Sequence, residues 1–135
     1  MEDIQELREQ LRKIPTIDLG GCIYAALAIA SKLRYSRIYY CYKITNSIIR
    51  EKYENNKAKK SAHSCSHAVV KHGNMFIDVD NIVTREELEK KYDVLLPVSK
   101  EWALKSLENV KEWNPSFRRN RWLPEIERIA NITFD

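Results

Sequence analysis

Hydrophobic residues near the start of the chain recur with the period of an α-helix. The pattern consists of Ile4, Leu7, Leu11 and Ile14. It predicts an amphipathic helix over residues 2–14, which ends before Pro15 because proline disfavours helical backbone at the preceding residue. After a loop at residues 16–21, the apolar run from Cys22 to Ala30 begins a second predicted helix that extends to Leu33. This run is far shorter than the roughly 20 residues that span a bilayer, so a buried core helix is expected.

The middle of the chain carries β-strand patterns. Residues 36–44, SRIYYCYKI, are rich in β-branched and aromatic side chains and are predicted to form a strand. In residues 67–82, HAVVKHGNMFIDVDNI, two β-prone runs flank Gly73 and Asn74, which tolerate the positive φ angles of a tight turn. This segment is therefore predicted to form an antiparallel hairpin.

The two-residue turn determines which side chains of the hairpin lie near one another. Counting outward from the turn places His67 opposite Asp80, with Asp78 diagonal to His67 on the same face. A histidine and a carboxylate are therefore expected to be neighbours. The other face is predicted to be apolar and to seal the core with Ala68, Val70, Met75, Ile77 and Val79.

The last third of the chain is predicted to be mainly helical. Thr84 and Glu87 match a capping box at the start of a helix that ends near Lys91. The further expected elements are a strand at residues 94–98 with Pro97 near its end or at a sheet edge, helices at 99–110 and 124–132, and an irregular segment at 113–122. Together these elements predict an α+β fold.

Composition narrows this prediction to one folded domain. The chain has 135 residues, of which 44% are hydrophobic and 31% charged, as expected for a globular protein. We expect a single domain with a core at about residues 16–100 and a C-terminal helical extension at about 101–135. The net charge of +4 is modest. The basic clusters at residues 57–60 and 118–121 lack interleaved aromatic side chains, so nucleic acid is not an expected partner. A membrane is not an expected partner either, because the longest apolar run is too short to span one.

The cysteine content and the first residues indicate the compartment. The charged segment at residues 2–14 lacks the apolar core of a secretory signal. Three cysteines, Cys22, Cys41 and Cys65, cannot all pair internally, so free thiols in a reducing cytoplasm are expected.

Cys22 is the first candidate for a catalytic residue. It follows Gly20 and Gly21 and opens the apolar helix, so its sulfur is expected at the positive end of the helix dipole, where a thiolate is stabilised. Glycines at these two positions leave room for a substrate carbonyl next to the Cys22 backbone N–H, which makes an oxyanion hole feasible. Read alone, Cys22 also fits a small buried hydrophobic residue.

His67 supplies the matching base. A carboxylate that accepts a hydrogen bond from an imidazole fixes its tautomer, as the third member of a catalytic triad does. Asp78 and Asp80 are both candidates for that role. A histidine on a strand is more often structural, but its carboxylate neighbours favour the catalytic interpretation.

The segments GGCIYAALAIASKL and SHAVVKHGNMFIDVDNI resemble the small papain-like and transglutaminase-like cysteine hydrolases of bacteria and their phages. The resemblance spans about residues 16–100. It implies a papain-like fold in which a buried helix carrying the cysteine packs on an antiparallel sheet. It also implies Cys22 as nucleophile, His67 as general base and acid, and Asp78 or its rival Asp80 as the orienting carboxylate.

Two positions depart from the family pattern. Asn81 stands where the family commonly has a glycine, and Thr16 stands where papain relatives have a glutamine that donates to the oxyanion. The implied activity is cofactor-independent acyl transfer, as in a peptidase, an amidase or a related hydrolase or transferase. Its substrate would be a protein, a peptide or a small amide or ester.

Two other functions fit parts of the sequence. His63, Cys65 and His67 alternate and would share one face of a strand, so with Cys22 they form a candidate zinc site. A non-catalytic binding module on the same fold is the second alternative, with partner contacts from Trp102, Trp113 and Trp122.

Overall fold

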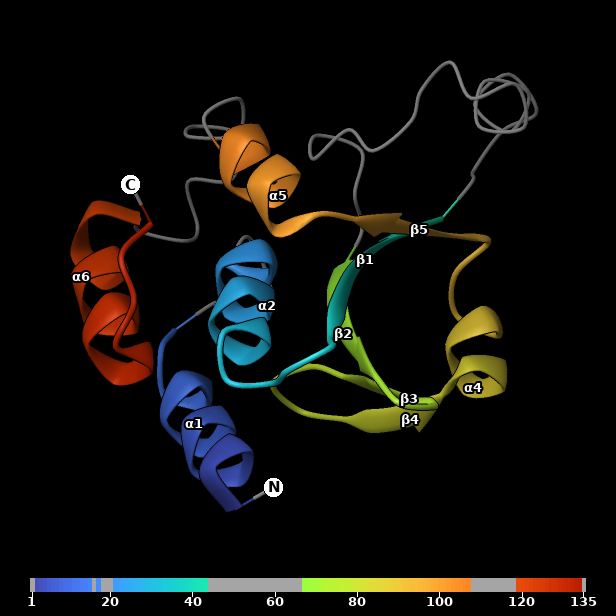
Figure 1. Cartoon of the computed structure of the whole chain (residues 1–135), viewed down its shortest axis with the longest axis horizontal. Helices are drawn as coiled ribbons and strands as arrows, with labels where there is room; N and C mark the ends of the chain where they lie inside the picture. The colour runs from blue at the N-terminus through green and yellow to red at the C-terminus, as the bar shows by residue number, and fades with distance from the viewer. Residues whose placement is uncertain (1, 16, 18–20, 44–66, 108–118, 135) are drawn as a thin grey trace.

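The computed structural model describes residues 2–15, 17, 21–43, 67–107 and 119–134 (Figure 1). The helices of this part of the chain are α1 (Glu2–Arg12), α2 (Cys22–Ala30), α4 (Arg85–Glu89), α5 (Lys100–Leu107) and α6 (Arg119–Ala130). Its strands are β1 (Arg37–Tyr42), β2 (His67–His72), β3 (Met75–Ile77), β4 (Ile82–Thr84) and β5 (Val94–Val98). The predicted mixed α+β class is confirmed.

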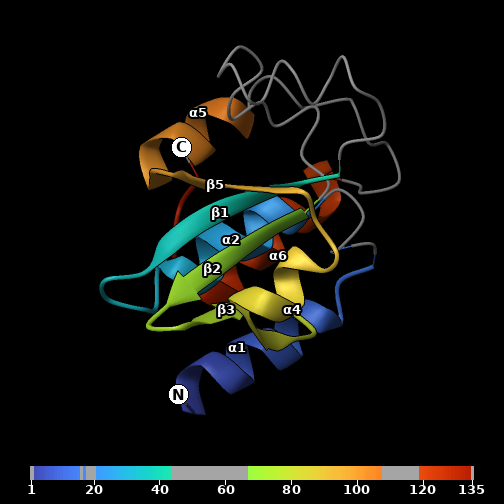
Figure 2. The ribbon, with the colours of Figure 1, turned by 90° about the vertical axis from the view of Figure 1, so that its right-hand side faces the viewer.

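The strands form one antiparallel sheet with the order β4-β3-β2-β1-β5 (Figure 2). β2 is the central strand and pairs with β1, although residues 43–66 of the chain separate the two. β5 is an edge strand, which explains why it accommodates Pro97, a residue without a backbone N–H. The sheet thus brings the start of β2 next to the end of β1, where Cys41 is the register partner of His67.

The hairpin turn forms as predicted, but the return strand is shorter than expected. Gly73 has a φ of 61°, and His72 pairs with Met75. Pairing ends at Ile77, where the chain turns and returns as β4, a strand the sequence did not predict. The expected pairing of His67 with Asp80 is therefore wrong, because Asp80 lies in the turn after β3.

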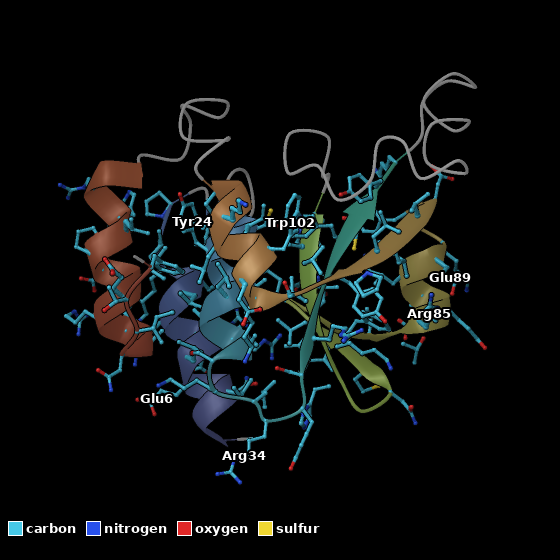
Figure 3. The ribbon with its side chains drawn as sticks, turned by 45° about the horizontal axis from the view of Figure 1, so that its top comes forward. Glu6, Tyr24, Arg34, Arg85, Glu89 and Trp102 are labelled. Atoms are coloured by element: carbon cyan, nitrogen blue, oxygen red, sulfur yellow. The ribbon has the colours of Figure 1, made fainter. Side chains whose placement is uncertain are left out.

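Helices cover both faces of the sheet. Figure 1 shows α2 between the sheet and the pair α1 and α6, with α4 beyond the opposite face of the sheet. Figure 3 shows Glu6 on α1 and Arg85 and Glu89 on α4 on these opposite sides. Every α2 residue after Cys22 is buried, because this helix is surrounded by the sheet and other helices.

The hydrophobic core has two parts. Ala68, Val70, Ile77 and Val79 join the main cluster, as predicted, whereas Met75 does not belong to it. The opposite face was expected to be polar, but there a second cluster consists of Cys41, Val69, Phe76 and Leu88. α4 carries Leu88 against that face. A strand buried on both faces loses the polar alternation of a half-exposed strand, as β2 does at Ala68–Val70.

The helix boundaries follow local signals only in part. The predicted capping box is confirmed: Thr84 caps α4 and the Glu87 side chain accepts from the Thr84 backbone. By contrast, α6 begins at Arg119 and contains Pro124, so the predictions of an irregular segment to 122 and a helix start at 124 are wrong. Burial of Ile126 and Ala130 against neighbouring helices offsets the hydrogen bond lost at the proline.

No helix within the described ranges is long and apolar enough to cross a membrane.

Candidate active site

Cys22 is the first residue of α2. It is half-buried, whereas the eight residues that follow it are buried, so its side chain lies where the core meets the surface. Gly21, the residue before the helix, has a φ of −101°, which any residue adopts. Glycine therefore matters at this position because it has no side chain. The first N–H groups of α2 receive no side-chain cap from residue 21.

His67, the first residue of β2, contacts both other members of the candidate triad. Its Nε2 lies 2.8 Å from Asp78 Oδ2, and it also forms a hydrogen bond with Cys22. Because Nε2 is occupied by Asp78, the ring nitrogen left for the sulfur is Nδ1. The imidazole thus lies between the thiol and the carboxylate.

The surroundings of His67 favour its charged form. Burial alone lowers the pKa of the ring, but the hydrogen bonds with Asp78 and Cys22 and the charges of these two residues raise it to about 10. The ring is therefore an imidazolium at neutral pH. Tyr92 stacks on it with a centroid separation of 6.0 Å and an interplanar angle of 15°. A cationic ring over an aromatic face is stabilised further.

Asp78 uses both carboxylate oxygens as acceptors. Oδ2 faces His67, while Oδ1 accepts from the backbone N–H groups of Asp80 and Asn81 at 2.8 and 2.6 Å. Burial raises the pKa of Asp78, but the hydrogen bond and the charge of His67, together with these backbone donors, hold it below its usual value. The turn after β3 thus supplies an ionised carboxylate in a fixed orientation.

Asp80 occupies a different environment. Its side chain is exposed and forms an ion pair with Arg12 at 3.3 Å. The local sequence explains the difference between the two aspartates. The Asp78 carboxylate accepts hydrogen bonds from residues two and three positions farther along the chain, which folds the chain into a turn and carries Asp80 outward.

Cys41 lies on β1 directly opposite His67. It is fully buried, and burial raises the pKa of its thiol to about 12, with further increases from the charges of Cys22 and Asp78. Cys41 is therefore a protonated and inaccessible thiol at neutral pH. It provides an internal comparison for the half-buried Cys22.

The sequence did not single out three side chains that support the site. Tyr92 stacks on His67, and Arg8 and Arg12 bind the turn that contains Asp78. Arg8 and Arg12 are four residues apart on α1, so they lie on the same side of this helix. That spacing was visible in the sequence, but nothing in it indicated what the two residues contact.

Several predicted site residues lie outside the described residues. These are Gly20 and Thr16, next to the candidate oxyanion site, and His63 and Cys65 of the candidate zinc site. Within the described part of the chain, no group of three or more histidine, cysteine or acidic side chains is arranged to hold a metal ion. A depression of about 270 Å³ on the side of α1 and α6 is lined by none of the triad residues.

Comparisons of this chain with family models, with curated proteins and with solved structures found no match.

Proposed function

We propose that this protein is a cysteine-dependent acyl-transfer enzyme that uses Cys22, His67 and Asp78 as its catalytic triad. The observation that carries the proposal is that His67 is hydrogen-bonded to both Cys22 and Asp78. Cysteine catalysis needs a thiolate, a base that takes the thiol proton and a group that orients the base. These three residues match those roles.

The same geometry supports Asp78 over Asp80 as the orienting residue. Asp78 accepts from Nε2, which leaves Nδ1 to exchange a proton with the sulfur. Asp80 is occupied by Arg12 at the surface. The papain-like fold is part of the proposal, supported by a buried helix that begins with the cysteine and packs on β2 of an antiparallel sheet.

The proposed reaction begins with a thiolate–imidazolium pair. The Cys22 thiolate attacks the substrate carbonyl carbon and forms a C–S bond, while the carbonyl electrons move to oxygen. The resulting oxyanion lies near the Cys22 backbone N–H at the start of α2. As the tetrahedral intermediate collapses, the leaving amine or alkoxide takes the proton from Nδ1 of His67 and an acyl-enzyme remains.

The second half-reaction restores the starting state. Neutral His67 removes a proton from water or from an acceptor amine, and that nucleophile attacks the thioester carbon. The C–S bond then breaks and returns its electron pair to sulfur. Proton and charge balance is complete because the thiolate and the imidazolium are both regenerated.

Acyl-enzyme formation tests this proposal. Incubation with p-nitrophenyl acetate, an activated ester, is expected to place an acetyl group on Cys22, as located by peptide mass spectrometry after a short reaction. Cys22→Ala should abolish this adduct and the accompanying burst of nitrophenol. Cys41→Ala is the matched control and should retain both, because Cys41 is fully buried.

The adduct should then disappear with time, faster in wild type than in a His67→Ala variant, because the imidazole activates the water that releases the acyl group. If Cys22 were acetylated no faster than Cys65 in unfolded protein, the catalytic proposal would be wrong. The non-catalytic binding module would then be the better interpretation.

A further inference from the structure

Among the charged residues in the described part of the chain, Arg8 alone is buried. Only 4% of it is exposed, although it lies on α1, near the surface of the domain. Burial of a guanidinium is costly unless its donors find acceptors. Its Nε donates to the backbone carbonyl of Asp78 at 2.7 Å, and its Nη1 donates to the Gln5 side chain at 3.1 Å.

The Asp78 carbonyl completes a set of contacts around this residue. The Asp78 backbone N–H donates to the carbonyl of Asn81, Oδ1 accepts from two backbone N–H groups, and Oδ2 faces His67. Contacts from within the turn orient the carboxylate relative to the turn itself. The contact from Arg8 comes from another element and holds the residue relative to the rest of the domain.

Arg12 makes a parallel contact one residue farther along. Its Nη2 donates to the carbonyl of Val79 at 2.8 Å, and its Nε forms the ion pair with Asp80. These contacts join α1 to the turn between β3 and β4. Arg8 and Arg12 therefore bind consecutive carbonyls of the same turn, but only Arg8 binds the residue whose carboxylate reaches His67.

We infer that Arg8 is a positioning residue for the proposed triad, because it holds the backbone of Asp78 so that its carboxylate meets Nε2 of His67. The inference rests on the proposed function. A carboxylate displaced by even about 1 Å lengthens its hydrogen bond to the imidazole beyond the range in which such a bond stabilises the charged ring. Removal of Arg8 is thus expected to act on Cys22 through Asp78 and His67.

The test compares Arg8→Met with Arg12→Met by measuring how fast iodoacetamide alkylates Cys22 as a function of pH. Methionine preserves much of the length and apolar packing of arginine but donates no hydrogen bond. We expect Arg8→Met to lower the rate at about pH 6 by roughly 10-fold, since it weakens one charge-assisted hydrogen bond, and to shift the profile to higher pH. Arg12→Met should change the rate less than about threefold.

Arg8→Lys serves as the conservative variant and as the safeguard against misfolding. A lysine ammonium provides a donor for the Asp78 carbonyl, so Arg8→Lys should recover part of the rate that Arg8→Met loses. Protection of the buried Cys41 from iodoacetamide reports that each variant is folded. If Arg8→Met does not protect Cys41, Arg8→Lys is compared with wild type instead. The alkylation rate of Cys22 should then be lower in Arg8→Lys than in wild type, and its pH profile should lie at higher pH.

Two outcomes would overturn the inference. Folded Arg8 variants whose pH profile matches that of wild type would reduce Arg8 to an anchor of α1. The proposed function would stand in that case, provided that Cys22 is alkylated faster in wild type than in His67→Ala at acidic pH. If the two alkylation rates were equal, the proposed function would fail, and the role of Arg8 would fail with it.

Discussion

Replacement of His67 by alanine is expected to lower the alkylation rate of Cys22 at about pH 6 by roughly 10- to 100-fold. Iodoacetamide alkylates the thiolate form of cysteine, and in the proposed triad His67 takes the proton of the Cys22 thiol. This imidazole should therefore speed the reaction at a pH where an isolated thiol, with a pKa of about 8.5, is only about 0.3% ionised. The measurement is iodoacetamide labelling, quantified for each cysteine by peptide mass spectrometry.

His72→Ala is the matched control for this experiment. His72 is at the other end of β2, next to the hairpin turn, so its removal deletes the same side chain from the same strand. The rate at Cys22 should then stay close to that of wild type. Equal effects of the two substitutions would mean that His67 supports only the strand and not the sulfur.

Asp78→Asn is expected to slow Cys22 alkylation by about 10- to 100-fold at the same pH, since a charge-assisted hydrogen bond contributes about 1.5–3 kcal/mol. Asp78 accepts hydrogen bonds on both oxygens, but an asparagine side chain has one acceptor oxygen. If that oxygen keeps the backbone donors of the turn, the amide NH₂ faces Nε2 of His67. The imidazole then loses the carboxylate that stabilises its charged form.

Asp80→Asn makes the same chemical change two residues away and removes only an exposed ion pair with Arg12. Exposed pairs contribute about 0.2–1 kcal/mol, so this variant should alkylate within about threefold of wild type. Greater sensitivity to Asp80→Asn than to Asp78→Asn would reverse the assignment of the orienting carboxylate.

Local sequence patterns predicted most elements of the fold. The helical period of α1, the helix propensity of the apolar run in α2, the turn at Gly73 and Asn74 and the capping box at Thr84 all depend on residues close together in the sequence. β4 was missed because its three residues are a strand only by pairing with β3. The start of α6 was misplaced because burial against other helices outweighs the local effect of Pro124.

For the candidate site, too, local patterns predicted the positions of residues within their elements but not the contacts between distant elements. The position of Cys22 at a helix start and of His67 at a strand start follows from local patterns. The choice between Asp78 and Asp80 did not, because an ideal hairpin continues its register, whereas the carboxylate of Asp78 accepts backbone hydrogen bonds that end it. Tyr92 and Arg8 reach the site from distant elements, and no local pattern encodes such contacts.

Titration of the His67 ring by NMR most directly tests whether a sulfur, an imidazole and a carboxylate act as one unit. In wild type the ring should remain protonated up to about pH 10. In Cys22→Ala, loss of the hydrogen bond and charge of the sulfur leaves burial less opposed, so the pKa of His67 should fall. A ring that titrates near its ordinary pKa of about 6.5 in wild type, and does not respond to Cys22→Ala, would contradict the proposed triad.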